Sequence, residues 1–490
     1  MVKKRILQGL FLLVCLYFVL LIPDSSKPVS LIETNGQPFI WHQDNFWKKL
    51  ENDFIIAKEM KPDQLDSSLN SLRNEAELIF ASISADSVFK NDRSLKEVEK
   101  LFFSLAPLIA VKNTELKWYL DYYNRIRNFV KYHSQYWDMK NLAVRNTIYR
   151  LLYGMRAAVE EVLIQADGKL INPVLIVKDE RAITPATRIF GIEVHSGDLL
   201  VSRGGAAVSA LISRGNDYPG NFSHVALLYV DEKTGKAHLI EAHIEKGVAV
   251  STVEEYEQDK KLRFMVMRPR QNLAALTADP MLPHKAAKMM FDESQNRHIP
   301  YDFKMNFYDS AAMFCSEVAS YAYRKNGLQF WQPVSTISSP GIVNWLHDFG
   351  VTHFVTQMPS DLEYDPQLAV VAEWRDPETL FKDHIDNAVM DAMLERANAG
   401  ASIDYNTWKL PLVRMIKGYC IIKNIFGKTG IIPEGMSATR ALKNQSFVAM
   451  HHRIKLITEQ KVKEFIKLKQ YKPPYRQLVQ FAIEASNRQQ

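Results

Sequence analysis

Residues 222–243 read FSHVALLYVDEKTGKAHLIEAH and contain the pattern from which the fold of the middle of the chain follows. Two apolar runs, 224–230 and 237–242, lie on either side of a turn sequence at 231–235. Short apolar runs that are bounded by turn residues predict β-strands. His224 opens the first run and Glu241 lies inside the second, so each predicted strand carries one polar side chain.

The same β-type pattern continues on both sides of this stretch. Further short runs occur at 174–177, 198–202, 248–251, 264–267 and 368–374. A helical pattern covers 284–293, and another helix opens near Cys315. This order of elements predicts an α+β domain with a small, mostly antiparallel sheet over residues 171–376.

The sequence on either side of this domain is helical. Apolar residues recur at helical spacing between 46 and 166, and the pattern returns after 376. Such stripes are typical of packing faces in a helical bundle, so we assign no chemistry to them. We therefore expect four parts: an N-terminal segment at 1–23, a helical region at 30–170, the α+β domain at 171–376 and a C-terminal helical region at 377–490.

The C-terminal region contains a basic segment between 453 and 476. It holds eight Lys or Arg residues against two Glu, interleaved with apolar residues. This pattern is typical of the solvated face of a terminal helix. A basic amphipathic helix that lies on anionic lipid is the alternative.

Composition excludes several classes of protein. The chain of 490 residues has a net charge of only +6 and no phosphate-binding, dinucleotide-binding or zinc-protease motif, and we expect no nucleic-acid partner. Its 3 cysteines, Cys15, Cys315 and Cys420, are too few for a disulfide scaffold or a cysteine-rich zinc site. A Cys315–Cys420 disulfide remains open at this stage and would silence the thiol chemistry discussed below. The oligomeric state does not follow from the sequence.

The N-terminus carries a targeting signal. Lys3, Lys4 and Arg5 precede an apolar run at 6–22 without a small-residue cleavage site after it. We therefore expect an uncleaved signal anchor, a transmembrane helix within 1–23 that tethers the protein to a membrane. The basic flank would stay in the cytoplasm, which places the rest of the chain outside it, in the periplasm or at the cell surface. A cleaved signal, which would give a secreted protein, is the alternative.

His224 and Glu241 stand in contexts that suit catalysis. A histidine that opens an apolar strand is usually a structural residue, but at the end of a strand its ring can face a cleft. A carboxylate inside an apolar strand is costly unless it is paired, and a neighbouring imidazole is a natural partner. Such a pair fixes the tautomer and orientation of the ring, as the third member of a catalytic triad does.

Cys315 lies at the start of a predicted helix, in the sequence Phe314-Cys315-Ser316-Glu317. The free backbone N–H groups and the dipole at a helix N-terminus stabilise a thiolate. The same N–H groups can bind an oxyanion during acyl transfer. A lone cysteine is more often a buried apolar side chain, but three such polar residues in one domain favour chemistry.

The order of these motifs resembles a known family. The sequences 197–200 (GDLL), 223–225 (SHV), 240–242 (IEA) with 247–248 (GV), and 314–317 (FCSE) are similar to those of the permuted papain-like amidases of the NlpC class, the YiiX/YaeF type. The histidine precedes the cysteine here, as the permuted branch requires. The resemblance covers roughly residues 190–375 and predicts a permuted papain-like fold.

The resemblance also implies roles for individual residues. Cys315 would be the nucleophile, His224 the general base and then acid, and Glu241 the orienting group. A related acyltransferase branch uses a histidine in the third role, which makes His243 a rival. Substrate contacts are implied for Tyr301 and Asp302, with possible help from the residues Tyr308 and Asp309. No metal or cofactor is implied, and the similar segment at 359–362 has no role that we can assign.

The expected activity is hydrolysis of an amide or ester bond through a thioester on Cys315, with no metal required. A cell-wall peptide is one candidate substrate for a protein outside the cytoplasm. Two alternatives stay open. One is a lipid acyltransferase or thioesterase of the lecithin–retinol acyltransferase-like branch, and the other is a membrane-tethered binding protein without catalysis.

Overall fold

The centre of the molecule is a seven-stranded antiparallel sheet with the strand order β1-β11-β8-β4-β5-β6-β7. The computed structural model describes residues 2–24, 36–83, 92–166, 168, 171–177, 180–331 and 335–488. The seven β-type runs predicted from the sequence are the seven strands of this sheet. They are β1 (Val174–Ile176), β4 (Leu199–Gly204), β5 (His224–Val230), β6 (Ala237–His243), β7 (Gly247–Thr252), β8 (Lys261–Pro269) and β11 (Leu368–Trp374).

The pairing of β5 with β6 brings His224 and Glu241 to one side of the sheet. Ala226 lies opposite Glu241 in this antiparallel pair. Side chains alternate along a strand, so His224 points to the same face as Ala226 and is a diagonal neighbour of Glu241. The register therefore places the two polar residues within reach of each other.

Two helices cover the other face of the sheet. They are α11 (Leu282–Asn296) and α12 (Cys315–Lys325). Val318 and Ala319 of α12 share a buried apolar cluster with Leu227 and Ile240 of the sheet. Cys315, the first residue of α12, is held by this packing near the end of β5 at which His224 lies.

Two short pairings were not predicted. A hairpin of β2 (Ala186–Ile189) and β3 (Ile192–His195) packs over the sheet. Its turn, Phe190-Gly191, has positive φ at both residues, 49° and 76°. Tight hairpin turns require this geometry, but Phe190 is an unusual residue for it, which is why the sequence did not predict the hairpin. The other pairing joins β9 (Ser335–Thr336) and β10 (Val355–Thr356).

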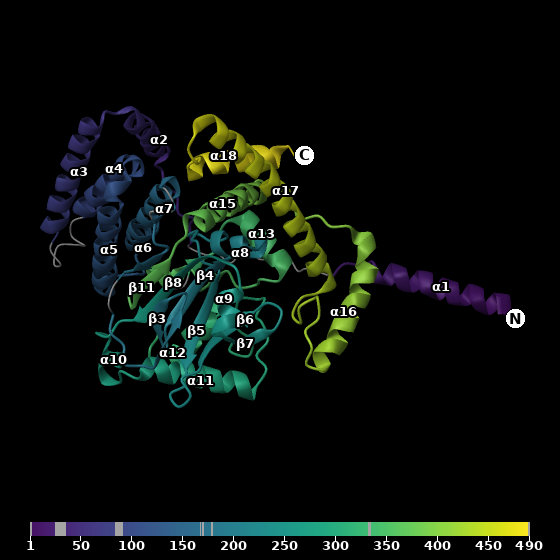
Figure 1. The fold of residues 1–490 in the computed structure, drawn as a ribbon. Coiled ribbons are helices and arrows are strands. Elements are labelled where there is room, and N and C mark those ends of the chain that lie inside the picture. Colours follow the sequence, from purple (N-terminus) through teal and green to yellow (C-terminus); the bar gives the residue numbers. More distant parts are fainter. Residues whose placement is uncertain are drawn as a thin grey trace.

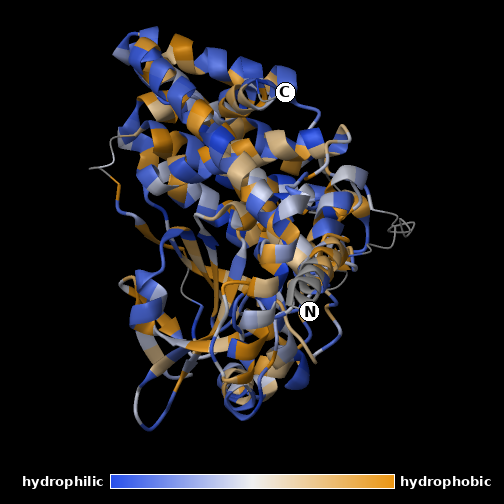
Figure 2. Cartoon of the chain, turned by 90° about the vertical axis from the view of Figure 1, so that its right-hand side faces the viewer, coloured by the Kyte–Doolittle hydropathy of each residue, from blue (hydrophilic) through white to orange (hydrophobic). Residues whose placement is uncertain are grey.

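Helices flank the sheet region at both ends of the chain, as predicted, so the α+β class with helical flanks is confirmed (Figure 1). Apolar residues are concentrated in the strands of the sheet and along one side of many helices (Figure 2). The division of the chain into the four parts stays a prediction. The N-terminal helices are α2 (Asp44–Glu59), α3 (Pro62–Ser82), α4 (Asp92–Val111), α5 (Leu116–His133), α6 (Leu142–Tyr149) and α7 (Met155–Gln165), and the C-terminal helices are α15 (Pro377–Asn398), α16 (Leu410–Ile425), α17 (Ala438–Lys469) and α18 (Tyr475–Asn487). Within the middle region lie α8 (Ala207–Arg214), α9 (Val253–Gln258), α10 (Ala274–Ala278), α13 (Pro340–Phe349) and α14 (Asp361–Tyr364).

The predicted N-terminal anchor forms a helix, α1 (Val2–Leu20), but its spanning role is not supported. No helix in the described part of the chain combines the length and the apolar character needed to cross a bilayer. The reason is visible in α1, whose start contains Lys3, Lys4 and Arg5 and whose apolar part ends at Leu20. What remains is shorter than the roughly 20 apolar residues that a spanning helix needs.

The basic segment at 453–476 spans the end of α17 and the start of α18. Four of its cations form ion pairs with acidic residues elsewhere in the protein, among them Lys455 with Asp386 and Arg476 with Glu51. These ion pairs favour the prediction that the segment is the solvated face of a terminal helix over the alternative that it lies on anionic lipid.

Candidate active site

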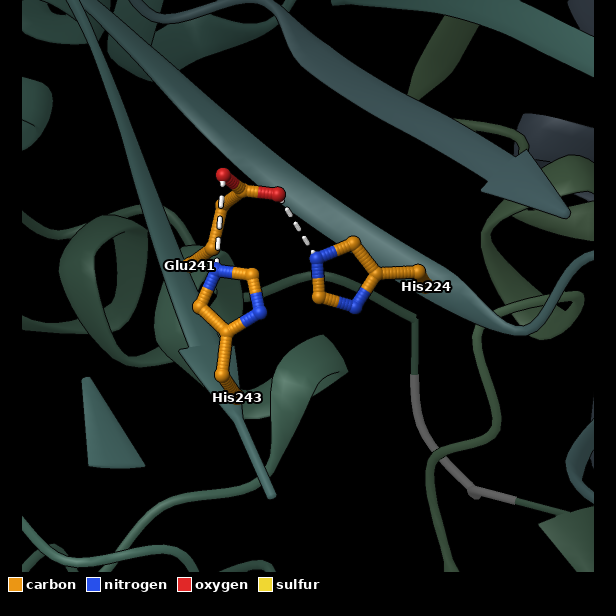
Figure 3. A group of neighbouring side chains, drawn as sticks. All are labelled: His224, Glu241 and His243. Atoms are coloured by element: carbon orange, nitrogen blue, oxygen red, sulfur yellow. Dashed lines mark hydrogen bonds and ion pairs between the residues drawn. The ribbon is translucent and has the colours of Figure 1, made fainter. Parts of the chain in front are cut away.

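Glu241 and His224 form a direct hydrogen bond. Nε2 of His224 donates to Oε2 of Glu241 at 2.8 Å (Figure 3). The other oxygen, Oε1, accepts from the hydroxyl of Ser251 on β7 at 2.6 Å. The side chain of Glu241 is 5% exposed, so the carboxylate is fixed in a largely water-free position from which it can orient the imidazole.

His243 lies beside His224 and faces the other oxygen of the same carboxylate. Its Nε2 lies 3.7 Å from Oε1 of Glu241, and its ring centroid is 5.5 Å from that of His224. In Figure 3 one carboxylate oxygen of Glu241 faces each of the two imidazoles. His243 is therefore a neighbour of the glutamate and does not replace it as the partner of His224.

Cys315 completes the group. It is the first residue of α12, is 4% exposed, and its thiol lies 3.7 Å from the carbonyl oxygen of Ser223, the residue before His224. Cys315 is also close enough to the imidazole of His224 to raise the pKa of that ring. Because Nε2 is directed at Glu241, the nitrogen available to the thiol is Nδ1. The structure thus brings Cys315, His224 and Glu241 together in the order that a catalytic triad requires.

The surroundings of His224 keep its ring charged. Burial alone would lower the pKa of His224, but the hydrogen bonds and negative charges of Cys315 and Glu241 outweigh it and raise the pKa from 6.5 to about 10. Burial likewise opposes the charge of Glu241, yet the hydrogen bonds from His224 and His243 hold the pKa of Glu241 well below its ordinary value. The imidazole is therefore protonated at neutral pH, which is the state that pairs with a thiolate.

The side chains of His224, Glu241 and His243 also have the composition of a metal site. Their ligand atoms lie within 4.8 Å of one another, and two histidines with a glutamate suit zinc. Two ligand atoms on a tetrahedral zinc ion would be roughly 3.3 Å apart, given metal–ligand distances of about 2.0 Å. The 2.8 Å separation of Nε2 of His224 and Oε2 of Glu241 is that of a hydrogen bond. The arrangement does not fit a metal centre as it stands, and we derive no step through one.

The segment before α12 lies next to the thiol. Burial, followed by the nearby Cys315, raises the pKa of Tyr301 well above its ordinary value, so this phenol stays neutral. Asp302 is buried and accepts hydrogen bonds from the backbone N–H groups of Lys304 (2.8 Å) and Asn306 (2.6 Å). Its observed contacts therefore shape the loop.

The other residues expected to contact substrate lie further out on the same loop. Tyr308 is 64% exposed and contacts Phe307 and Arg324. Asp309 is exposed and accepts from the backbone of Ala311. These contacts of Tyr308 and Asp309 are with the loop itself and with α12. A substrate role for these residues stays a prediction.

Glu317 is a residue that the sequence analysis quoted only as part of a motif. It is fully buried in the first turn of α12, two residues after Cys315. Neither carboxyl oxygen has a hydrogen-bond partner within the described part of the chain. Burial, then the negative charge of Asp302, raises the pKa of Glu317 from 4.5 to about 9, so the side chain is neutral at physiological pH.

The segment at 359–362 fixes the approach to β5. The hydroxyl of Ser360 accepts from the backbone N–H of Phe222 at 3.0 Å and donates to its carbonyl oxygen at 3.1 Å. Phe222 lies two residues before His224, so Ser360 holds the start of the strand in place. In the sequence, this segment was noted only for its similarity to the family, and that similarity did not indicate a role for Ser360.

The motif glycine and aspartate at 197–198 have structural roles. Asp198 accepts two hydrogen bonds from Arg268, at 2.8 and 2.7 Å, which ties β4 to β8. Gly197 has φ of +97° and lies against Pro283 at the start of α11, where a side chain would not fit.

All three cysteines, Cys15, Cys315 and Cys420, are free. The disulfide that the sequence left open is therefore not formed, and Cys315 keeps its thiol.

Comparisons with known proteins match the region of the chain that holds these residues. Residues 193–372 match the family described as permuted papain-like amidase enzyme, YaeF/YiiX, C92 family. Among solved structures, a similar one is the crystal structure of the metalloprotein yiiX from Escherichia coli O157:H7, with 20% identity and a TM-score of 0.29 over 36% of this chain and 95% of that chain. A search of curated proteins found no match.

The resemblance predicted from the motifs is thus confirmed at the level of the family, over the region that holds Cys315, His224 and Glu241. The family supports a cysteine-type hydrolase at a coarse level. Residues 193–372 of this chain are similar to the permuted papain-like amidases of the YaeF/YiiX type.

Proposed function

We propose that the protein is a cysteine hydrolase that cleaves an amide or ester bond through a thioester on Cys315. The observation that carries this proposal is the grouping of three side chains: Nε2 of His224 is hydrogen-bonded to Glu241, and the thiol of Cys315 lies 3.7 Å from the carbonyl oxygen of the residue before His224. A charged imidazole with a carboxylate behind it supports a thiolate in front of it.

The reaction has two steps. The thiolate of Cys315 attacks the carbonyl carbon, and the protonated His224 gives its proton to the leaving amine or alcohol as the thioester forms. His224, now neutral, takes a proton from water, which attacks the thioester and releases the acid and the free thiol. Glu241 accepts from Nε2 throughout and keeps Nδ1 directed at the reacting atoms.

The start of α12 supplies the oxyanion site in this proposal. The first N–H groups of a helix point outward from its N-terminus without partners in the helix itself. Cys315 is the first residue of α12, so its own N–H is positioned close to its thiol. Donors of this kind stabilise the negative oxygen of the tetrahedral intermediate more than they stabilise the substrate.

The substrate class follows from the family, whose members are described as amidases. A peptide amide is therefore the first substrate to test. If an amine or an alcohol accepts the acyl group in place of water, the same thioester intermediate leads to acyl transfer. Amines and alcohols should therefore be added as acyl acceptors in the same assay. The similar crystal structure is described as a metalloprotein, but that likeness is too distant to assign a metal here.

Acylation of the thiol by an activated ester tests the proposal. The protein is mixed with p-nitrophenyl acetate, quenched in acid and digested, and the acetyl group is located by mass spectrometry. We expect it on the peptide that contains Cys315, and roughly 100-fold slower labelling in His224→Ala, because general-base catalysis contributes at least that much. Cys420→Ala is the matched control, since Cys420 is an equally buried thiol without a histidine partner among its contacts. Equal labelling of wild type and His224→Ala would refute the mechanism.

A further inference from the structure

Helix α16 exposes a regular apolar stripe that nothing in the described part of the chain covers. We call this the α16 stripe: Leu412, Met415, Tyr419, Ile422 and Phe426, which are 60, 69, 63, 55 and 75% exposed. Their alternating spacing of three and four residues puts them on one side of the helix. Scattered exposed apolar residues are normal in proteins, but a contiguous row of five is typical of an interaction surface.

The opposite side of α16 is already used for packing. Leu410 and Cys420 are buried, and Val413 and Ile416 pack against the same apolar clusters. The helix is therefore apolar on two sides, a pattern expected of a helix that is buried all round. Packing within the protein explains one side and leaves the α16 stripe unexplained.

Helix α1 extends the exposed apolar surface. Arg414 of α16 donates to the carbonyl oxygens of Leu20 at 3.0 Å and Ile22 at 2.6 Å, and it pairs with Asp24 at 2.9 Å. Tyr17 stacks on Trp408 where the two helices meet, with ring centroids 6.3 Å apart. Figure 1 shows α1 projecting from the body beside α16, and Figure 2 views the molecule from that side. The exposed apolar side chains on α1 include Phe11, Leu12, Leu16, Phe18 and Val19.

The charges on α16 and on the residues that flank it directly are all positive. Between residues 405 and 433 the sequence contains five cations, Lys409, Arg414, Lys417, Lys423 and Lys428, and no Asp or Glu. Lys409 and Lys428 are exposed. An apolar face with flanking lysines and with Trp and Tyr at its margin is the composition of helices that lie in the headgroup region of an anionic bilayer.

We propose that the α16 stripe and the exposed apolar side of α1 together form a surface that binds anionic lipid. Neither helix crosses the bilayer in this arrangement, and both lie along it. A second copy of the chain fits less well, because pairing two such surfaces would bring lysines of both copies together. The loop at 301–309 meets α16 on the side opposite the stripe, where Phe303 packs in the same cluster as Cys420.

Co-sedimentation of the full chain with vesicles tests this surface. The probes are vesicles of phosphatidylcholine alone and of phosphatidylcholine with phosphatidylglycerol. We expect binding to the anionic vesicles that weakens with salt, and a loss of roughly tenfold or more in the triple variant Met415→Ser, Tyr419→Ser and Ile422→Ser, because its apolar burial is removed. The matched control changes three equally exposed apolar residues elsewhere, Leu78→Ser, Ile183→Ser and Leu468→Ser, and should bind like the wild type.

A second variant keeps the test valid if the triple variant fails to fold. Lys423→Glu with Lys428→Glu leaves the apolar stripe intact and should lower binding to anionic vesicles while leaving the weak binding to neutral vesicles unchanged. Absence of vesicle binding by the wild type, or equal binding by wild type and both variants, overturns the proposal. A wild-type dimer that the triple variant converts to a monomer, without vesicle binding, assigns the surface to a second copy instead.

Discussion

Glu317 is a buried acid whose protonation state sets a pH dependence of stability. Its pKa is raised from 4.5 to about 9 in the folded protein, so folding binds a proton between these values. The free energy of unfolding should therefore fall as the pH rises from 4.5 towards 9. Glu317→Gln, which cannot ionise, should remove this decline and be at least as stable as the wild type at pH 8.5. Urea unfolding of both proteins at pH 5 and pH 8.5 measures it, and parallel pH dependences would show that Glu317 is charged when buried.

His224 and Glu241 contribute to stability with opposite pH dependences. The contribution of His224 is lost at high pH, and that of Glu241 is lost at low pH. The pKa of His224 is raised from 6.5 to about 10, so its stabilisation is complete below pH 6.5 and is lost as the pH rises through about 10. The pKa of Glu241 is lowered from 4.5, so its stabilisation is complete above pH 4.5 and is lost as the pH falls through the lowered value. Both contributions are complete between pH 4.5 and 6.5.

His224→Gln removes the charged partner and should lower the melting temperature most within this window. The difference from the wild type should shrink as the pH approaches 10, and melting followed by circular dichroism measures it. A difference that stays constant from pH 6 to pH 10 would mean that His224 is neutral in the folded protein.

At the scale of single elements, the start of β7 shows how tightly the sheet is joined to the loop beside the site. Gly247 has φ of +73°, and a Cβ there would lie 2.1 Å from the carbonyl oxygen of Ile299. Gly235 has a similar φ of +68° in the turn before β6, but a Cβ there would meet nothing within 4 Å. Both Gly→Ala changes carry the strain of the left-handed region, about 1 kcal/mol, and only Gly247→Ala adds a backbone clash.

We therefore expect Gly247→Ala to lower the free energy of unfolding by several kcal/mol and Gly235→Ala by about 1 kcal/mol. Chemical denaturation of the two variants measures the difference. Equal effects would show that the strand shifts away from Ile299 without loss.

The elements of the sheet region followed from local pattern, because each strand is a short apolar run between turn residues. The β2–β3 hairpin could not be predicted from local pattern, because its turn contains Phe190 with a positive φ, which is unusual for phenylalanine. The three central site residues were predicted from their contexts and from the order of the family motifs. The roles of Ser251, Ser360 and Glu317 were not, because each depends on a contact with a residue distant in the chain or on complete burial.

At the scale of the whole molecule, a buried ionic network joins the helical flanks to the sheet. Arg156 on α7 forms hydrogen bonds with Glu363 at 2.6 and 2.9 Å and with Glu160 at 2.7 Å. Arg263 on β8 in turn pairs with Glu160 and with Asp383 on α15. These side chains are at most 3% exposed, so three predicted parts of the chain meet in one water-free network. Sequence pattern cannot predict such pairs, because ionic partners have no fixed spacing.

Breaking this network should destabilise the whole chain. Arg263→Met leaves Glu160 and Asp383 buried without one cationic partner, and we expect a loss of about 3–5 kcal/mol in the free energy of unfolding. Arg125→Met is the control, because its pair with Glu77 is largely exposed and is worth at most about 1 kcal/mol. Unfolding monitored by circular dichroism and by tryptophan fluorescence compares the two. A small effect of Arg263→Met would mean that the flanks and the sheet are held together mainly by apolar packing.

The central claim is that His224 activates the thiol of Cys315, and the rate of alkylation of Cys315 by iodoacetamide against pH tests it most directly. The measurement uses Cys15→Ala as background, so that the exposed Cys15 does not contribute. In this background we predict that Cys315 reacts at pH 6 nearly as fast as at pH 8, and that His224→Ala abolishes the reaction at pH 6, because the imidazolium sustains the thiolate. If Cys315 instead becomes reactive only near pH 8.5, as a free thiol does, with or without His224, the account of the site is wrong.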